Sequence, residues 1–169
     1  MGGFRKLLAA TFLIVILLVN SFSCGSSDGN ILGKKAPYFT AVSIDNTLIN
    51  LNDFLGNPVI LNFWAIRCPY CVEEMPYLQQ VYEEHAVDGL IVLGVNDAES
   101  AGNVKPYIEN HKYTFTIILD EDSSIGNKYG VYYLPTTYLI DRDGIVRDII
   151  IGSFQNKEDI EKHLEKIID

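Results

Sequence analysis

The chain has 169 residues, 48% hydrophobic and 21% charged, a composition that favours one globular domain over a disordered chain or a coiled coil. Thirteen Lys and Arg residues stand against 22 Asp and Glu residues, which gives a formal net charge of −9. Binding to nucleic acid or to an anionic membrane surface needs a basic patch, so this charge argues against both kinds of partner. Three cysteines are too few for a small fold held together by disulfides.

The first 23 residues are typical of an export signal. Arg5 and Lys6 form a short basic region with no acidic residue near it. Leu7 to Val19 is an apolar run that only Thr11 interrupts, and it is shorter than the roughly 20 residues that span a bilayer. A secretory signal has this combination of a basic start and a short apolar run.

Cys24 follows the apolar run and opens a segment rich in Gly and Ser, residues 24–33, which we interpret as a flexible tether. The arrangement resembles a bacterial lipoprotein cleavage site with Cys24 as the lipidated residue, although Ser21 stands where that pattern usually has Leu. An uncleaved signal anchor and a free Cys24 are the alternatives. All three place the remaining chain outside the cytoplasm, where disulfides form and persist.

Residues 34–169 are expected to form one α/β domain. Apolar runs predict strands, and apolar residues at helical spacing predict helices. In chain order we expect a hairpin over 41–51, a helical turn at 52–57, a buried strand at 59–64, a helix that begins at the Cys68–Cys71 segment, a strand at 90–95, a helix at 104–111, a strand at 114–119 and a helix at 123–129. A hairpin from 136 to 151 follows, with its turn at 141–144. Asn156 caps the last helix, whose apolar face is formed by Ile160, Leu164, Ile167 and Ile168. Parallel strands joined by helices, with an antiparallel hairpin at one edge, give a three-layer α/β fold with a central mixed sheet.

Cys68 and Cys71 are separated by two residues where the expected buried strand meets a helix. At a helix N-terminus, free N–H groups and the helix dipole stabilise a thiolate, which is the nucleophile of disulfide exchange. The second cysteine, one turn along, can then resolve a mixed disulfide. Pro69 suits the first helical position, where its missing N–H removes no hydrogen bond. The pattern indicates a redox-active dithiol.

An inert structural disulfide and half of a zinc site are the alternatives for this pair. A structural zinc site needs four ligands. Cys24 lies in the N-terminal segment, and the three histidines are scattered singly along the chain, at His85, His111 and His163. We therefore expect no metal and no other cofactor.

Two segments, Asn62–Cys71 and Val131–Asp141, resemble the active-site and cis-proline segments of the thioredoxin family. Within that family the likeness is to the TlpA/ResA-like extracytoplasmic thiol–disulfide oxidoreductases. These carry an N-terminal hairpin, a β-α insert before the cis-proline and a Glu three residues after the second cysteine, here Ala41–Leu51, Leu90–His111 and Glu74. The resemblance covers about residues 33–168 and implies a thioredoxin-like fold.

The resemblance assigns roles to residues around the pair. Pro135 is expected to be cis, to face the cysteines and to leave the neighbouring backbone free to pair with a substrate strand. Glu74 is expected to be a partly buried acid that tunes the pKa of the thiols or moves a proton. Asn62 stands where many thioredoxins have a titratable Asp, so any proton transfer passes to Glu74 or to water.

Arg67 departs from the family, which usually has Trp before the first cysteine. The change removes a flat apolar docking surface. Arg67 either helps, as a cation, to stabilise the thiolate or is merely tolerated at this position. The dipeptide Pro69-Tyr70 is shared with glutaredoxins, which are less reducing than thioredoxin. Tyr70, Tyr132 and Tyr133 either line the groove around the site or pack as ordinary core or surface residues.

The favoured function is a thiol–disulfide oxidoreductase outside the cytoplasm, which the resemblance makes a reductant of envelope proteins. Clients of this family include the haem-binding cysteines of apocytochrome c, with electrons supplied by a membrane thiol transporter. We expect a monomer that its N-terminus tethers to the membrane.

Two other functions are possible on a similar fold. A thiol peroxidase needs Thr or Ser three residues before the reactive cysteine, where this chain has Ala65. A copper-binding assembly protein spaces its cysteines by three residues and adds a His.

Overall fold

A computed structural model describes residues 31–168. The expected export segment, Cys24 and most of the expected tether lie outside the described residues. Within residues 31–168, no helix is both long enough and apolar enough to cross a bilayer. The chain contacts the domain from the first described residues onward, because Ile31 packs against the core and Gly33 donates a backbone hydrogen bond to Val146. Residues at the end of the expected tether thus contact the domain.

A five-stranded mixed sheet forms the centre of the molecule, in the order β5-β4-β3-β6-β7. The strands are β3 (Val59–Trp64), β4 (Ile91–Asp97), β5 (Thr116–Asp120), β6 (Thr136–Ile140) and β7 (Val146–Ile151). The three strands β3, β4 and β5 run parallel, whereas β6 pairs antiparallel with both β3 and β7. All six residues of β3 are buried, as expected for the central strand of a sheet that is covered on both faces.

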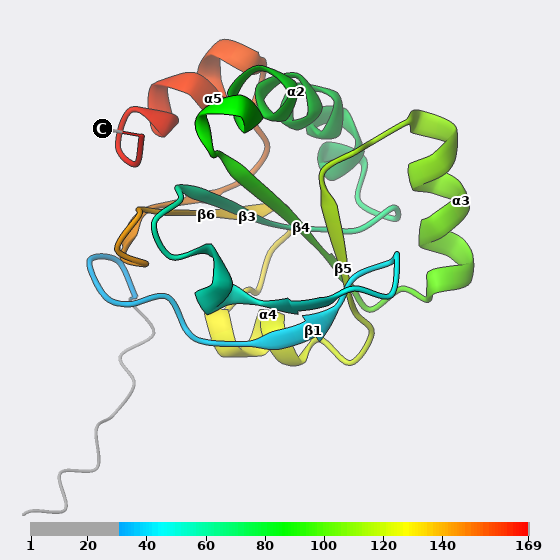
Figure 1. The fold of residues 1–169 in the computed structure, drawn as a ribbon. Coiled ribbons are helices and arrows are strands. Elements are labelled where there is room, and N and C mark those ends of the chain that lie inside the picture. Colours follow the sequence, from blue (N-terminus) through cyan, green and yellow to red (C-terminus); the bar gives the residue numbers. More distant parts are fainter. Residues whose placement is uncertain (1–30, 169) are drawn as a thin grey trace, which may run out of the picture.

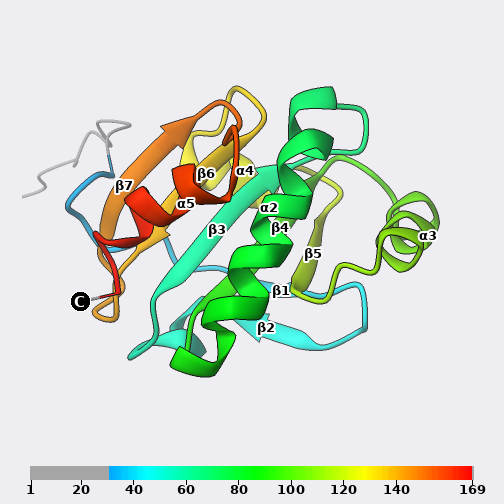
Figure 2. The same ribbon diagram turned by 90° about the horizontal axis from the view of Figure 1, so that it is seen from above.

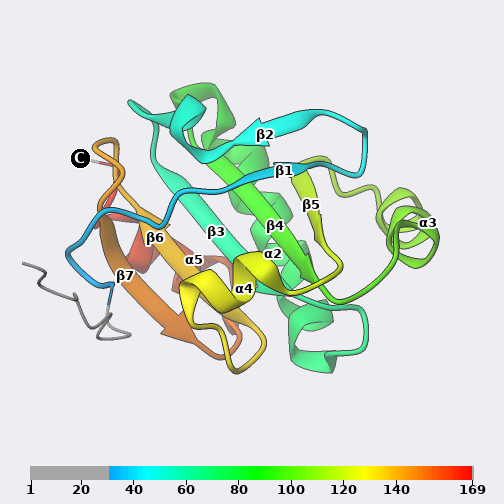
Figure 3. The same ribbon diagram turned by 90° about the horizontal axis from the view of Figure 1, so that it is seen from below.

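Helices cover both faces of the sheet (Figure 1). The helices α2 (Pro69–His85) and α5 (Lys157–Leu164) lie together over one face, and α3 (Ala101–His111) lies beside β5 (Figure 2). The short helix α4 (Ser124–Tyr129) lies on the opposite face with the N-terminal hairpin (Figure 3). These layers confirm the three-layer α/β fold with a central mixed sheet.

The N-terminal hairpin forms a separate two-stranded sheet from β1 (Thr40–Val42) and β2 (Leu48–Asn50). A 3-10 turn at Leu51–Phe54 leads from it to β3, and another at Ala86–Asp88 follows α2. Helix α2 continues through Pro76. The last helix begins after Asn156, whose side chain accepts from Asp159 N as predicted. It ends at Leu164, so Ile167 and Ile168 lie beyond the helix to which their spacing had assigned them.

The alternation of β3 determines which residues meet α2. Ile60 and Trp64 belong to the core under α2, while Leu61 and Phe63 belong to the core on the opposite face. Because successive side chains of a strand point to opposite faces, Asn62 points to the α2 side with Ile60 and Trp64. A polar side chain is thus buried directly under the helix that follows the cysteine pair.

Candidate active site

Cys68 and Cys71 are joined as a disulfide at the start of α2, with Cα atoms 5.3 Å apart. Cys68 is the N-cap residue, and its sulfur accepts from Cys71 N over 3.3 Å. Pro69 occupies the first turn, as its missing N–H predicts. Cys68 is partly exposed whereas Cys71 is fully buried. A partner can therefore approach the sulfur of Cys68 more easily than that of Cys71.

The segment that leads into β6 lies against the cysteine pair. The peptide bond between Leu134 and Pro135 is cis, as the resemblance implied. The carbonyl oxygen of Leu134 lies 3.6 Å from the sulfur of Cys68, so this carbonyl can accept a hydrogen bond from the reduced thiol. On the far side, Pro135 O accepts from Gly152 N. The expected juxtaposition of Pro135 and the cysteines is present.

Glu74 is completely buried on the face of α2 that packs on the sheet. Its spacing of three residues from Cys71 places both side chains on this face. One carboxylate oxygen, Oε1, accepts from Asn62 Nδ2 over 2.8 Å, and the other, Oε2, accepts from Phe154 N over 2.9 Å. The same Asn62 nitrogen also donates to Thr137 Oγ1 over 2.9 Å.

The hydrogen-bond partners of Glu74 are all neutral, and its carboxyl group is buried. Burial disfavours the carboxylate and raises the pKa of Glu74 to about 7, although the hydrogen bonds from Phe154 and Asn62 act in the opposite direction. A carboxyl group that titrates near neutral pH can accept or release a proton under physiological conditions. Its neighbour Glu73 is exposed, as expected.

Arg67 is held by two acidic residues, Asp97 at the end of β4 and Glu99 in the loop that follows. Its guanidinium donates to Asp97 Oδ2 and to Asp97 O, each over 2.7 Å, and lies 3.7 Å from Glu99 Oε1. Glu99 in turn accepts from the backbone N–H groups of Ile66 (2.8 Å) and Arg67 (3.2 Å). The Arg67 cation therefore has two carboxylates as its own partners.

Large apolar side chains are exposed on both sides of the cysteine pair. Tyr70 lies between the cysteines and is 64% exposed, while Tyr132 and Tyr133 precede the cis-proline and are 86% and 70% exposed. Ile151, which pairs with Thr136 at the start of β6, is 67% exposed. None of the three tyrosines is core packing. Their exposure fits both a groove around the site and ordinary surface positions.

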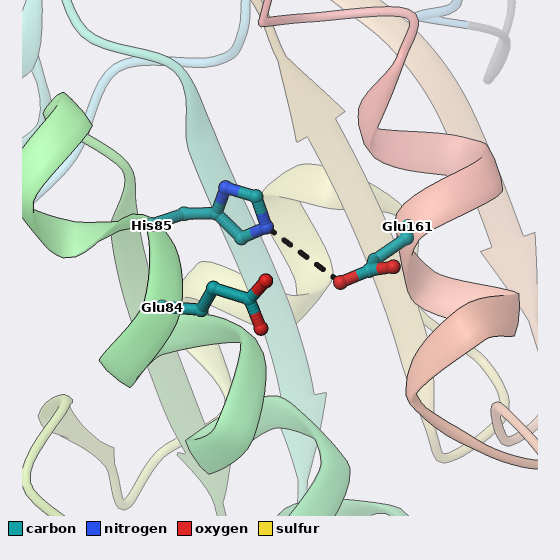
Figure 4. Close-up of side chains that lie close together, drawn as sticks. All are labelled: Glu84, His85 and Glu161. Atoms are coloured by element: carbon teal, nitrogen blue, oxygen red, sulfur yellow. Dashed lines mark ion pairs between the residues drawn. The ribbon is translucent and has the colours of Figure 1, made fainter.

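The described residues contain one group of potential metal ligands, and it lies away from the cysteines. Glu84 and His85, near the end of α2, approach Glu161 of α5 (Figure 4). Lys157 forms ion pairs with both Glu84 and Glu161, so both carboxylates already have an ammonium partner. These side chains form ion pairs that connect α2 to α5. The other histidines have partners elsewhere: His111 bonds to Tyr107 O and His163 to Asp148.

Sequence reasoning found the centre of this site but not its supports. It named both cysteines, Pro135 and Glu74, and it treated Asn62 only as a residue that cannot titrate. It did not single out Thr137, although a polar residue within an apolar strand is a signal that could have done so. Asp97 and Glu99 carry no local signal, because only the fold brings the end of β4 and the loop after it to Arg67.

Comparison with known proteins agrees with this geometry. Residues 32–149 match the model of the AhpC/TSA family. The chain is 40% identical over 136 residues to the thiol-disulfide oxidoreductase ResA of Geobacillus thermodenitrificans, which covers 80% of this chain and 78% of the relative. It is 34% identical over 165 residues to ResA of Bacillus cereus, covering 92% and 95%.

A similar fold is found in the crystal structure of a protein from Chlorobium tepidum that is assigned as a thiol:disulfide interchange protein DsbE. The TM-score is 0.76 with 29% identity, over 82% of this chain and 98% of the other. The identity over most of both sequences, the shared fold and the Cys68–Cys71 pair lead to one conclusion. The chain belongs to the AhpC/TSA family and is a ResA-like thiol–disulfide oxidoreductase of the thioredoxin superfamily.

Proposed function

We propose that this protein reduces disulfides in proteins outside the cytoplasm, with Cys68 as the attacking and Cys71 as the resolving cysteine. The observation that carries the assignment is the difference in access between the two sulfurs at the start of α2: Cys68 is partly exposed and Cys71 is buried. The helix N-terminus also favours a thiolate at Cys68.

The exchange runs in two steps. The Cys68 thiolate attacks one sulfur of the client disulfide, and the other client sulfur leaves as a thiolate. Cys71 then attacks the Cys68 sulfur, the second client sulfur leaves, and the Cys68–Cys71 disulfide forms. Two electrons pass to the client, and the protein ends in the disulfide form described above. A membrane thiol transporter is the proposed donor that returns it to the dithiol.

Glu74 is proposed to take the proton of the Cys71 thiol, which must become a thiolate before it attacks. Its location in the first turns of α2, its burial and a pKa of about 7 support this role. Glu74→Gln should therefore shift the pH dependence of thiol alkylation in the reduced protein, whereas Glu73→Gln should leave the curve in place. An unchanged curve for Glu74→Gln would exclude the role.

Clients are proposed to bind as extended segments against the cis-proline and the exposed tyrosines. Tyr70, Tyr132 and Tyr133 offer apolar surface beside the reactive sulfur, in a molecule that otherwise carries a net negative charge. Apocytochrome c, with its pair of haem-binding cysteines, is the client that the family resemblance suggests. The protein is proposed to act as a monomer.

Trapping tests the cysteine roles directly. Cys71→Ser should form mixed disulfides with clients but not release them, so covalent adducts should accumulate in the cell envelope and disappear on adding reductant. Cys68→Ser should accumulate few or none. Equal trapping by both variants, or the reverse pattern, would overturn the assignment, and mass spectrometry of the adducts identifies client and donor.

The N-terminus is proposed to anchor the protein to the membrane through lipid on Cys24. The apolar run before Cys24 and the Gly/Ser-rich segment after it support this proposal. Mass spectrometry of protein from its native host should show a diacylglyceryl group on a chain that starts at Cys24. A chain that retains Met1 would contradict lipidation and favour a signal anchor.

A further inference from the structure

The hydrogen bonds of Glu74 suit its charged form better than its protonated form. Both oxygens of the carboxylate face N–H donors: Oε1 faces Asn62 Nδ2 and Oε2 faces Phe154 N. This arrangement suits a carboxylate, which only accepts hydrogen bonds. A carboxylic acid carries a proton that itself needs an acceptor, and a buried hydroxyl without one is unfavourable.

Only one of the two donors can be exchanged for an acceptor without moving the backbone. Phe154 N is a main-chain group and keeps its direction. Asn62 ends in an amide, and a half-turn of that amide replaces its nitrogen by its oxygen. The oxygen concerned, Asn62 Oδ1, is buried and has no hydrogen-bond partner among the described residues. An unused acceptor therefore lies on the very side chain that contacts Oε1.

Thr137 permits both orientations of the amide. In the observed one, Thr137 Oγ1 accepts from Asn62 Nδ2 over 2.9 Å. A hydroxyl can also donate, so after the half-turn it can bond to Oδ1 instead. β3 and β6 place Asn62 and Thr137 directly opposite each other, and both side chains are fully buried. Thr137 Oγ1 thus bonds to Asn62 in either orientation, while the turn moves Asn62 Nδ2 from its two acceptors to the position that Oδ1 now occupies.

We propose that Asn62 is a positioning residue whose amide turns over when Glu74 gains a proton. With the carboxylate, Nδ2 donates to Glu74 and Thr137. With the acid, the proton sits on Oε1 and is donated to Oδ1, which also accepts from Thr137. The proton that Glu74 gains comes from a thiol in the exchange reaction, or from solvent when the protein is oxidised. The functional meaning of this motion rests on the proposed role of Glu74, but the motion itself can be tested without catalysis.

A test of this motion must distinguish the titration of Glu74 from that of other groups near it. From its own helix, Cys71 faces the same core, and in the oxidised protein it does not titrate. From β3 and β6 the neighbours Asn62 and Thr137 are neutral. On the α5 side, the ring of Phe154 packs against His163, which contacts Asp148 and shares that carboxylate with Lys166. Imidazoles titrate in the same pH range as the event of interest, so His163→Gln is the matched control.

The experiment follows the side-chain amide of Asn62 by 15N NMR in the oxidised full chain while the pH is varied. At high pH one amide proton should show the downfield shift of a hydrogen bond to a carboxylate. At low pH this shift should disappear, with the same midpoint as the 13C resonance of the Glu74 carboxyl group. His163→Gln should keep this transition.

Glu74→Gln supplies the decisive comparison. Gln is neutral at every pH, and with its oxygen on Phe154 N it presents an NH2 group to Asn62, which should hold the amide in the turned orientation. The downfield signal should be absent at all pH values. A signal that persists in Glu74→Gln, or an Asn62 amide that ignores the Glu74 titration in the wild-type protein, would overturn the proposal.

Two further variants measure the coupling. Asn62→Leu removes the donor that favours the carboxylate, so the midpoint of the Glu74 titration should rise by roughly 1 to 2 pH units. Thr137→Ser keeps the hydroxyl and should leave the midpoint where it is. An unchanged midpoint in a folded Asn62→Leu protein would contradict the coupling. If that variant does not fold, the Glu74→Gln comparison still decides.

Discussion

Two acidic side chains support the cysteine pair from opposite sides, and their surroundings differ. Glu74 lies in the core beneath α2, and its hydrogen-bond partners among the described residues are an amide and a backbone N–H, both neutral. Glu99 lies on the outer side, where it accepts from two backbone N–H groups and contacts the guanidinium of Arg67. Among the described residues Glu74 has no cationic partner, whereas the carboxylate of Glu99 lies 3.7 Å from the guanidinium of Arg67.

The difference shows how the same functional group serves two purposes around one reactive pair. Burial without a cation leaves Glu74 ready to change its protonation state near neutral pH. The backbone bonds of Glu99 instead fix the chain directly before Cys68, so this carboxylate acts as a structural anchor. We expect substitutions at Glu74 to change the pH dependence of stability, and substitutions at Glu99 to lower stability by a nearly constant amount from pH 6 to pH 8.

The largest expected effect is the pH dependence of stability that Glu74 causes. In the unfolded chain its carboxyl group loses its proton near pH 4.5, but in the folded protein only near pH 7. Between these values the folded state binds more protons, so the stability of the wild-type protein falls as pH rises through this window. Glu74→Gln lacks this loss. The free energy of unfolding of the variant should therefore gain up to ~3 kcal/mol relative to wild type between pH 4 and pH 8.

Urea denaturation of the oxidised proteins across this pH range measures the effect. Glu73→Gln, an exposed change of the same kind one residue away, should give a curve parallel to wild type. A Glu74→Gln curve that also stays parallel to wild type would mean that Glu74 keeps an ordinary pKa in the folded protein.

A smaller effect is expected for Glu99→Ala. The substitution removes the acceptor for Ile66 N, Arg67 N and Asn96 Nδ2. Loss of such partners should lower the free energy of unfolding by about 1–3 kcal/mol. Because the loss is one of hydrogen bonds, it should be nearly constant from pH 6 to pH 8. Glu121→Ala, at an exposed position, is the control; a Glu99→Ala loss that varies strongly with pH would remove the contrast with Glu74.

The fold and the centre of the site could be predicted because their signals are local. The apolar run of β3, the spacing of the cysteines and the turn at residues 141–144 each depend on a few neighbouring residues. Glu74 could be placed through the resemblance, which implies an acid three residues after the second cysteine. The helix end at Leu164 was missed because Ile167 and Ile168 continue the apolar spacing, and spacing does not show where the backbone leaves the helix.

The partners of these residues could not be predicted, because each comes from a distant part of the chain. Phe154 reaches Glu74 through a main-chain N–H, which no side-chain pattern reveals. Arg67 was expected either to act on the thiolate by its charge or to be merely tolerated. The end of β4 and the loop after it bring two carboxylates to Arg67, so its positive charge is partly neutralised before it can act on the thiolate.

The smallest effect is therefore expected for Arg67, whose side chain is half exposed. An exposed ion pair contributes little, so Arg67→Gln should lower the free energy of unfolding by less than about 1 kcal/mol. Arg67→Gln should also lower the reactivity of Cys68. Without the guanidinium, Asp97 and Glu99 place uncompensated negative charge near this cysteine. The rate of Cys68 alkylation in the reduced protein at low salt should fall by roughly two- to five-fold.

Salt and a charge-preserving variant separate this electrostatic effect from a structural one. The fall in rate for Arg67→Gln should shrink at about 1 M salt, because exposed charges are screened there. Arg67→Lys keeps the positive charge but loses the two-pronged contact with Asp97, so it should react nearly as fast as wild type while sharing the small loss of stability. If both variants slow alkylation equally and salt has no effect, then Arg67 acts by holding the loop in place. The outer side of the cysteine pair would in that case be purely structural, and Glu74 would be the acidic group of the two that acts on the chemistry.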